Sequence, residues 1–130
     1  MLVRQISIFM QNKPGALASL TRHLKGAKIN LIAISVPDTR EQGILRLVPE
    51  DPKALQSLLR AKGISFTESK VLAVDMTNRP GGLYAIAQKL KTAKIDVEYA
   101  YGSTGGDSGT ATIILQVSDL MRAQKLLTLG

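Results

Sequence analysis

Residues 9–31 read FMQNKPGALASLTRHLKGAKINL, and the pattern returns at residues 75–97 as DMTNRPGGLYAIAQKLKTAKIDV. The two stretches align without gaps at a constant offset of 66, and ten of their 23 positions are identical. Chance does not produce such a match, so the stretches are copies of one structural unit.

The duplication extends beyond these two stretches. The same offset pairs Gly43 with Gly109, and one additional residue aligns residues 51–63 with residues 118–130. The repeat therefore covers nearly the whole chain. It predicts two modules, residues 1–70 and residues 71–130.

Each copy predicts the same order of elements. Alternating or apolar runs predict strands, and leucines at helical spacing predict one helix after each Asn-x-Pro-Gly. In the first copy the predicted strands are 3–8, 29–36, 43–48 and 64–70, with helices after Pro14 and between Asp51 and Gly63. The order is that of an α+β, ferredoxin-like βαββαβ fold, with an antiparallel sheet and both helices on one face. The second copy ends at Gly130 and is predicted to lack the last strand.

Local signals refine this prediction. Pro14 and Pro80 are placed in the first helical turn, which tolerates a missing N–H. Asp51 and Ser118 are predicted N-caps of the second helix in each copy. Residues 31–36, LIAISV, are apolar at both the odd-numbered and the even-numbered positions, which face opposite sides of a strand. This predicts a strand that is covered on both faces, by the other repeat or by a second subunit.

Composition excludes several classes of protein. The 130 residues contain no cysteine and one histidine, which argues against disulfides, thiolate catalysis, metal clusters and catalytic triads. No apolar run is long enough to span a membrane, and the N-terminus begins a strand-like pattern instead of a signal peptide, so a cytoplasmic location is expected. A formal net charge of +7 favours anionic partners, and a solvated basic surface is the simpler interpretation.

The two loops Asn12-Lys-Pro-Gly-Ala-Leu and Asn78-Arg-Pro-Gly-Gly-Leu carry the chemistry that suggests a function. We expect backbone N–H groups at each helix N-terminus to be available to a carboxylate or phosphate. The asparagine side chain would accept a hydrogen bond from an ammonium group, so the pair suits an amino acid. The residues alone leave a structural interpretation open, in which the asparagine caps the helix and shapes the turn.

The series Asn12-Lys-Pro-Gly-Ala-Leu-Ala, Leu24 and Lys28-Ile-Asn-Leu resembles the signature of ACT domains. Over its full length the chain is similar to small stand-alone tandem ACT proteins of prokaryotes. The resemblance implies a non-catalytic regulatory protein that binds a small amino acid at an interface between ACT modules. It implies the ligand-binding residues Asn12, Gly15, Ala16, Leu17, Asn30 and Leu31 in the first module, and Asn78, Gly81, Gly82, Leu83, Asp96 and Val97 in the second. Asp96 departs from the usual asparagine, so its pocket either prefers a cationic group or is degenerate.

The resemblance also implies partners. A homodimer and a regulated metabolic enzyme are expected, and neither a cofactor nor a metal is required. The alternative is a nucleic-acid-binding ferredoxin-like protein, but the chain has few aromatic residues and no basic-aromatic run of the RNA-recognition type. No nucleophile–base pair supports an enzyme.

Three further features are assigned structural roles. Residues 102–109 are glycine-rich but lack the Lys-Ser/Thr of a phosphate-binding loop, which predicts a hairpin connection. His23 is expected on a partly exposed helix flank. Tyr99 and Tyr101 lie two residues apart and should project to one face of a strand.

Overall fold

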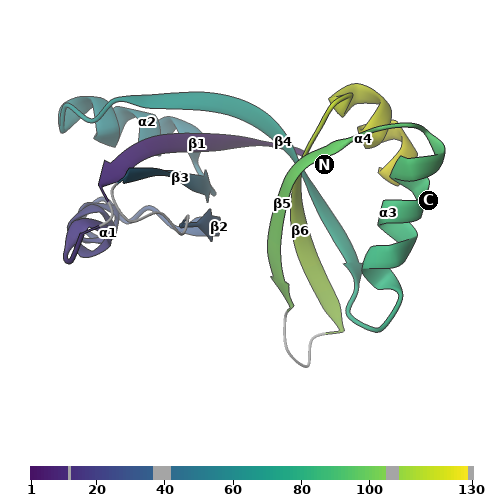
Figure 1. The fold of residues 1–130 in the computed structure, drawn as a ribbon. Coiled ribbons are helices and arrows are strands. Elements are labelled where there is room, and N and C mark those ends of the chain that lie inside the picture. Colours follow the sequence, from purple (N-terminus) through teal and green to yellow (C-terminus); the bar gives the residue numbers. More distant parts are fainter. Residues whose placement is uncertain (12, 37–41, 105–108, 129–130) are drawn as a thin grey trace. The chain divides into compact units, whose positions relative to one another are not determined.

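The computed structural model describes residues 1–11, 13–36, 42–104 and 109–128. The fold is α+β, with antiparallel strands and four helices (Figure 1). Asn12 and Gly130, which the sequence analysis singles out, lie outside the described residues. The elements are β1 (Leu2–Gln11), α1 (Ala16–Gly26), β2 (Leu31–Ser35), β3 (Gln42–Pro49), α2 (Pro52–Ala61), β4 (Phe66–Thr77), α3 (Gly82–Thr92), β5 (Val97–Thr104), β6 (Thr110–Val117) and α4 (Leu120–Thr128).

The chain divides into two compact units. We call Arg4–Ser69 the first module and Lys70–Gly130, together with Met1–Val3, the second module. The strand order is β2-β3-β1-β4 in the first module and β5-β6-β4-β1 in the second, because β1 and β4 each contribute residues to both. Each order is that of a ferredoxin-like sheet.

The N-terminal residues occupy the place of the strand that the second copy lacks. The Ala73 N–H donates to the Met1 carbonyl at 2.8 Å, and the Met1 amino group donates to the Ala73 carbonyl at 3.2 Å. This mutual exchange is the antiparallel pattern. Leu2 packs against the hydrophobic core of the second module. The start of β1 lies beside β4 in the sheet of the second module.

The helices of each module pack on one face of its sheet. In the first module the core joins α1 and α2 to alternate residues of β1 and β3: Ile6, Ile8, Leu20, Leu24, Leu45, Leu47, Leu55 and Leu59. In the second module α3 and α4 lie together on one side of β4, β5 and β6 (Figure 1). The predicted apolar side of each helix is buried at four positions, Leu20 and Leu24 in α1 and Ile86 and Leu90 in α3. The predicted stripe also included Leu17 and Leu83, but these two side chains are 39 % and 52 % exposed.

The structure corrects three of the predicted helix starts, those of α1, α3 and α4. Asp51 caps α2 as predicted, since its carboxylate accepts from the Ala54 N–H. In α4 the capping carboxylate is that of Asp119, which accepts from the Arg122 N–H, and Ser118 instead accepts from the Asp96 N–H. The helices α1 and α3 begin after a glycine N-cap, so Pro14 and Pro80 precede the helices instead of occupying their first turn.

Residues 31–36 keep partly exposed apolar side chains in the described chain. Ile32, Ile34 and Val36 are 49 %, 42 % and 45 % exposed, so the described chain does not cover them on both faces. Ile32 and Ile34 belong to β2, which is an edge strand of the first module's sheet, and Val36 directly follows that strand. The glycine-rich segment 102–109 does join the antiparallel neighbours β5 and β6, as a hairpin connection should, although residues 105–108 lie outside the described part.

Helices α1 and α3 are each followed, two residues after their last residue, by a lysine with a left-handed backbone. Lys28 and Lys94 have φ angles of 57° and 58°, and the N–H of each following isoleucine reaches back to Leu24 or Leu90. This is the Schellman arrangement, in which glycine is the preferred residue. Gly63 occupies the equivalent place after α2.

Replacing Lys94 with glycine should raise the free energy of unfolding by about 0.5–1 kcal/mol. The left-handed conformation costs a non-glycine residue about 1–2 kcal/mol, and the greater freedom of glycine in the unfolded chain offsets part of the gain. Urea denaturation of Lys94→Gly beside Lys91→Gly tests this, because glycine inside α3 should instead cost about 1 kcal/mol. Equal losses for both variants would contradict the assignment.

Candidate functional site

Glycine is required at the start of α1 and of α3. Gly15 and Gly81 are the N-cap residues, with φ angles of 87° and 94°. Residues with a Cβ rarely adopt this conformation, which explains the glycine after the proline in both loops. The predicted loops are therefore placed at helix N-termini, as the sequence analysis expected.

The backbone N–H groups of Ala16 and Gly82, which the sequence predicts to be free for a ligand, already form hydrogen bonds within the chain. The Ala16 N–H donates to the Lys13 carbonyl at 3.2 Å, and the Gly82 N–H donates to the Arg79 carbonyl at 3.1 Å. Both donors are used within their turns, because the chain bends back on itself before the helix starts. They cannot bind an anion unless these turns open.

Asn78 and Gly82 are fixed tightly within the second loop. The Asn78 N–H donates to the Gly109 carbonyl at 3.0 Å, which ties the loop to the start of β6. A Cβ on Gly82 would lie 2.3 Å from the Thr77 carbonyl oxygen, so a side chain does not fit in this backbone. The first copy has Ala16 at this position, so the two loops are not identical in shape.

Asn30 and Asp96 stabilise the starts of β2 and β5. The Asn30 Nδ2 donates to the Glu50 carboxylate at 3.1 Å, and the Glu50 N–H donates to the Asn30 carbonyl at 3.0 Å. Ser118 plays the same part in the second module, because its hydroxyl accepts from the Asp96 N–H and its N–H donates to the Asp96 carbonyl. Both pairs join a strand start to the end of the neighbouring strand.

The predicted site residues form two groups at opposite ends of each sheet. Leu31 pairs with Pro49, which the β1–β3 register places level with Arg4, whereas the loop begins after Gln11. Seven residues of strand separate the two levels, about 23 Å at 3.3 Å per residue. In the second module Val97 pairs with Val117, again seven residues along β4 from Thr77. Neither module by itself brings its loop and its strand start together.

Each loop borders a pocket on the helix side of its own sheet. The pocket of the second module is about 540 Å³, and that of the first is about 300 Å³. The first is lined by Ile8, Phe9, Met10, Gln11, Lys13, Ala16, Ser19, Leu20, His23 and Ile64. The second is lined by Val74, Asp75, Met76, Thr77, Arg79, Pro80, Gly81, Gly82, Ala85, Ile86, Lys89, Thr110 and Leu127. Nine of the ten residues that line the first pocket have equivalents, at the offset of 66, among the residues that line the second. Both modules therefore form this pocket from the same positions of the repeat.

The pockets contain few of the residues predicted from the sequence. Of these, Ala16, Gly81 and Gly82 line a pocket, whereas the strand-start group does not. Sequence reasoning missed Arg79 and Lys89 as lining residues. Helical spacing could have indicated them, since Gly82, Ala85, Ile86 and Lys89 recur along one face of α3. His23, the equivalent of Lys89, is half-buried on the helix flank as expected and lines the first pocket.

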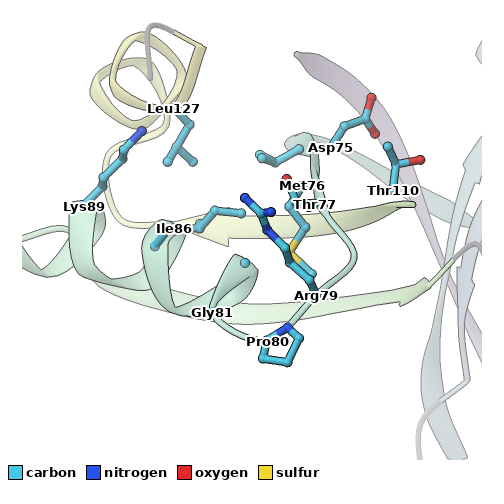
Figure 2. A pocket seen from close by; sticks show the side chains of 13 residues that line it. Asp75, Met76, Thr77, Arg79, Pro80, Gly81, Ile86, Lys89, Thr110 and Leu127 are labelled. Atoms are coloured by element: carbon cyan, nitrogen blue, oxygen red, sulfur yellow. The ribbon is translucent and has the colours of Figure 1, made fainter. Parts of the chain in front are cut away.

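Charged side chains distinguish the second pocket. Figure 2 shows Arg79 running into the pocket from the loop and Lys89 reaching it from α3, whereas the side chains of Asp75 and Thr110 point away from it. Within the described ranges neither Arg79 nor Lys89 forms an ion pair. The Asp75 carboxylate accepts a hydrogen bond from the Thr112 hydroxyl at 2.7 Å. This pocket therefore offers two positive charges that no described carboxylate neutralises.

The described part of the chain contains neither a cluster of metal-ligating side chains nor a helix that could span a membrane. No group of three or more His, Asp or Glu side chains gathers there in a way that could hold a metal ion. None of the described helices combines the length and the apolar character needed to cross a bilayer.

Comparison with known proteins identifies the family. A family model described as an ACT domain pair matches residues 1–129. The crystal structure of a protein from Bacteroides thetaiotaomicron superposes with a TM-score of 0.91 at 26 % identity, covering 98 % of this chain and 88 % of that one. The regulatory subunit of aspartate kinase from Thermus thermophilus has a TM-score of 0.64 at 17 % identity, covering 97 % and 91 %, and its counterpart from Thermus flavus has 0.58 at 17 %, covering 98 % and 94 %. No curated protein matches the sequence closely. With a duplicated ferredoxin-like fold and a family match over nearly its whole length, the chain belongs to the ACT domain pair family.

Proposed function

We propose that this protein is a non-catalytic regulator that binds an amino acid at a site composed of two modules. One module contributes the Pro-Gly loop at a helix N-terminus, and a module of a second copy contributes a strand start such as Asn30-Leu31. The observation that carries the proposal is the separation of about 23 Å between these two groups within each module. A ligand that contacts both groups has to lie between modules.

A second copy is the partner that we propose for the first module. The edge strand β2 exposes Ile32 and Ile34, and Val36, which directly follows it, is exposed as well. Edge strands also present unpaired backbone groups that another strand can bond. Pairing through this edge buries the apolar side chains, and sedimentation at micromolar concentration should give the mass of a dimer.

We further propose that amino-acid binding controls a metabolic enzyme. Two structures of similar fold are regulatory subunits of aspartate kinase, which supports a regulatory role without naming the target. Ligand binding would act by favouring one arrangement of the modules, which the enzyme then recognises. We place this system in the cytoplasm.

Isothermal titration of the full chain with each of the common amino acids tests the proposal. At least one amino acid should bind, and Asn30→Ala should weaken its binding roughly tenfold or more, because a hydrogen bond to a charged group is worth about 1.5–3 kcal/mol. Lys53→Ala is the control, since Lys53 is exposed on α2 and is not a residue of either group. Absence of binding by every amino acid, together with salt-sensitive binding of an oligonucleotide, would favour the nucleic-acid alternative instead.

A further inference from the structure

A groove lies between α3 and α4, which pack side by side in the second module (Figure 1). Its volume is about 440 Å³. The walls are mostly apolar or uncharged, and they include Tyr84, Ala85, Gln88, Lys89 and Thr92 of α3 and Leu126 of α4. The groove is distinct from the helix-side pocket, which lies between these helices and the sheet.

The groove opens to solvent on the side of α3 that faces away from the sheet. Tyr84, Gln88 and Thr92 recur every four residues and are exposed, whereas Ile86 and Leu90 of the same helix are buried in the core. From Tyr84 to Thr92 the helix rises about 12 Å, the length of about two helical turns. An amphipathic helix of a partner can therefore lie in the groove and place apolar side chains there at spacings of three and four residues.

The four described helices carry cations but no acidic residue. All ten acidic residues of the chain lie outside these helices. Helices that are only solvated usually carry both signs, because opposite charges one turn apart stabilise them. The helical surface therefore favours a partner that brings negative charge. The cations within the helices are Arg22, Lys25, Lys53, Arg60, Lys89, Lys91, Arg122 and Lys125.

Three of these cations lie at or beside the groove. Lys89 lines it, Lys125 precedes Leu126 in the chain, and Arg122 lies one turn before Leu126 on α4. Among described residues, Arg122 pairs with Asp119 at 3.9 Å, and Lys89 and Lys125 form no ion pair. Carboxylates of a docked segment would thus meet charges that no described carboxylate neutralises.

The first module does not repeat the walls of this groove. At the offset of 66, Ala18 stands in place of Tyr84, and Gly26 stands in place of Thr92. These smaller residues cannot form the same walls. The equivalent of Gln88 is Arg22, which is exposed on α1 and provides a matched control position.

We infer that the groove between α3 and α4 docks an acidic amphipathic helix of a partner protein, with apolar side chains in the groove and carboxylates beside Lys89, Arg122 and Lys125. This inference rests on the proposed function and identifies the surface that the regulated enzyme contacts. A nucleic acid fits less well, because its phosphates would contact the cations and leave the apolar walls uncovered. A bilayer fits less well, because the apolar surface is concave.

Fluorescence anisotropy with two synthetic helical peptides tests the inference on the full chain. Each peptide has about 14 residues, or four turns, with leucines at spacings of three and four. The remaining positions are glutamate in one peptide and glutamine in the other. The glutamate peptide should bind at least tenfold more tightly than the glutamine peptide, and added salt should reduce this difference.

Substitutions of Gln88 locate the binding surface, because its side chain is exposed and the fold does not depend on it. Gln88→Glu should weaken binding of the glutamate peptide at least fivefold, and Gln88→Lys should strengthen it twofold or more. The control Arg22→Glu changes the charge at the equivalent position of α1 and should stay within twofold of the parent. All three variants should keep the amino-acid affinity of the parent, since neither residue belongs to a Pro-Gly loop or a strand start.

The outcomes separate this inference from the proposed function. If the two peptides bind equally, or Arg22→Glu weakens binding as much as Gln88→Glu, the inference is wrong, while amino-acid binding would still support the proposed function. Binding of phosphatidylserine vesicles or of an oligonucleotide, with neither peptide bound, would also overturn the inference. If the glutamate peptide binds as expected but no amino acid does, the groove is a docking surface and the proposed function fails.

Discussion

Replacing Leu2 with aspartate is expected to destabilise the second module by about 2–4 kcal/mol while the first module keeps most of its stability. Leu2 packs against the core of the second module, although 70 residues separate it along the chain from Leu72, the β4 residue of that core. The substitution removes apolar contacts and brings a charge to the edge of that core. Hydrogen exchange should accelerate across β4, β5, β6 and α3, most of all at Ala73, whose N–H bonds to Met1.

Phe9→Asp provides the matched control for this experiment. Phe9 is an apolar residue of the same strand, but it is 72 % exposed, so its substitution should change the free energy of unfolding by about 0.5 kcal/mol or less. Unchanged exchange at Ala73 in the Leu2 variant would show that Met1–Val3 do not complete the second sheet. An equal loss of protection in both modules would contradict the selective effect.

The second large effect is expected from Gly82→Ala, which should cost about 1–3 kcal/mol. The added Cβ would lie 2.3 Å from the Thr77 carbonyl oxygen, a backbone atom that cannot move without shifting the end of β4. The shift would also distort the loop that carries Arg79, so amino-acid affinity should fall together with stability. Urea denaturation and titration of the same sample measure both effects.

The first module supplies the converse substitution. Ala16→Gly makes the first loop match the second in sequence at the first helical residue, and it should cost no more than about 1 kcal/mol, the difference in helix propensity. If Gly82→Ala lowered the free energy of unfolding no more than Ala16→Gly does, the close approach to Thr77 would not contribute to the cost of the substitution. Full ligand affinity in the Gly82→Ala variant would separate the loop from the binding site.

Much of the fold could be predicted from local patterns. Leucines at helical spacing, the Pro-Gly breaks and the capping carboxylate of Asp51 each act within a few residues, and the observed helices follow them closely. The errors arose where two local candidates compete. Ser118 and Asp119 are adjacent possible caps, and the pairing of Ser118 with Asp96, 22 residues away, leaves Asp119 as the cap.

The candidate site was harder to predict. The family motif indicates Gly15, Gly81, Asn30 and Asp96 as one set, but strand register places the loops and the strand starts at opposite ends of each sheet. Arg79 and Lys89 carry no motif, and their common pocket exists because α3 and α4 pack over β4. That these two side chains reach the same pocket depends on the packing of the helices against the sheet, which cannot be derived from their spacing along the chain.

By itself, the sequence determined that this protein is a duplicated α+β chain, because identities at a constant offset and the periods of 2 and 3.6 residues are properties of the chain itself. Only the tertiary structure decided that Met1–Val3 complete the second module, that each loop lies far from its strand start, and that Arg79 and Lys89, which form no ion pair with a described residue, share the second pocket. These features depend on hydrogen bonding and packing between residues distant in sequence. Pairing partners are selected by the fold as a whole, so no local pattern could have specified them.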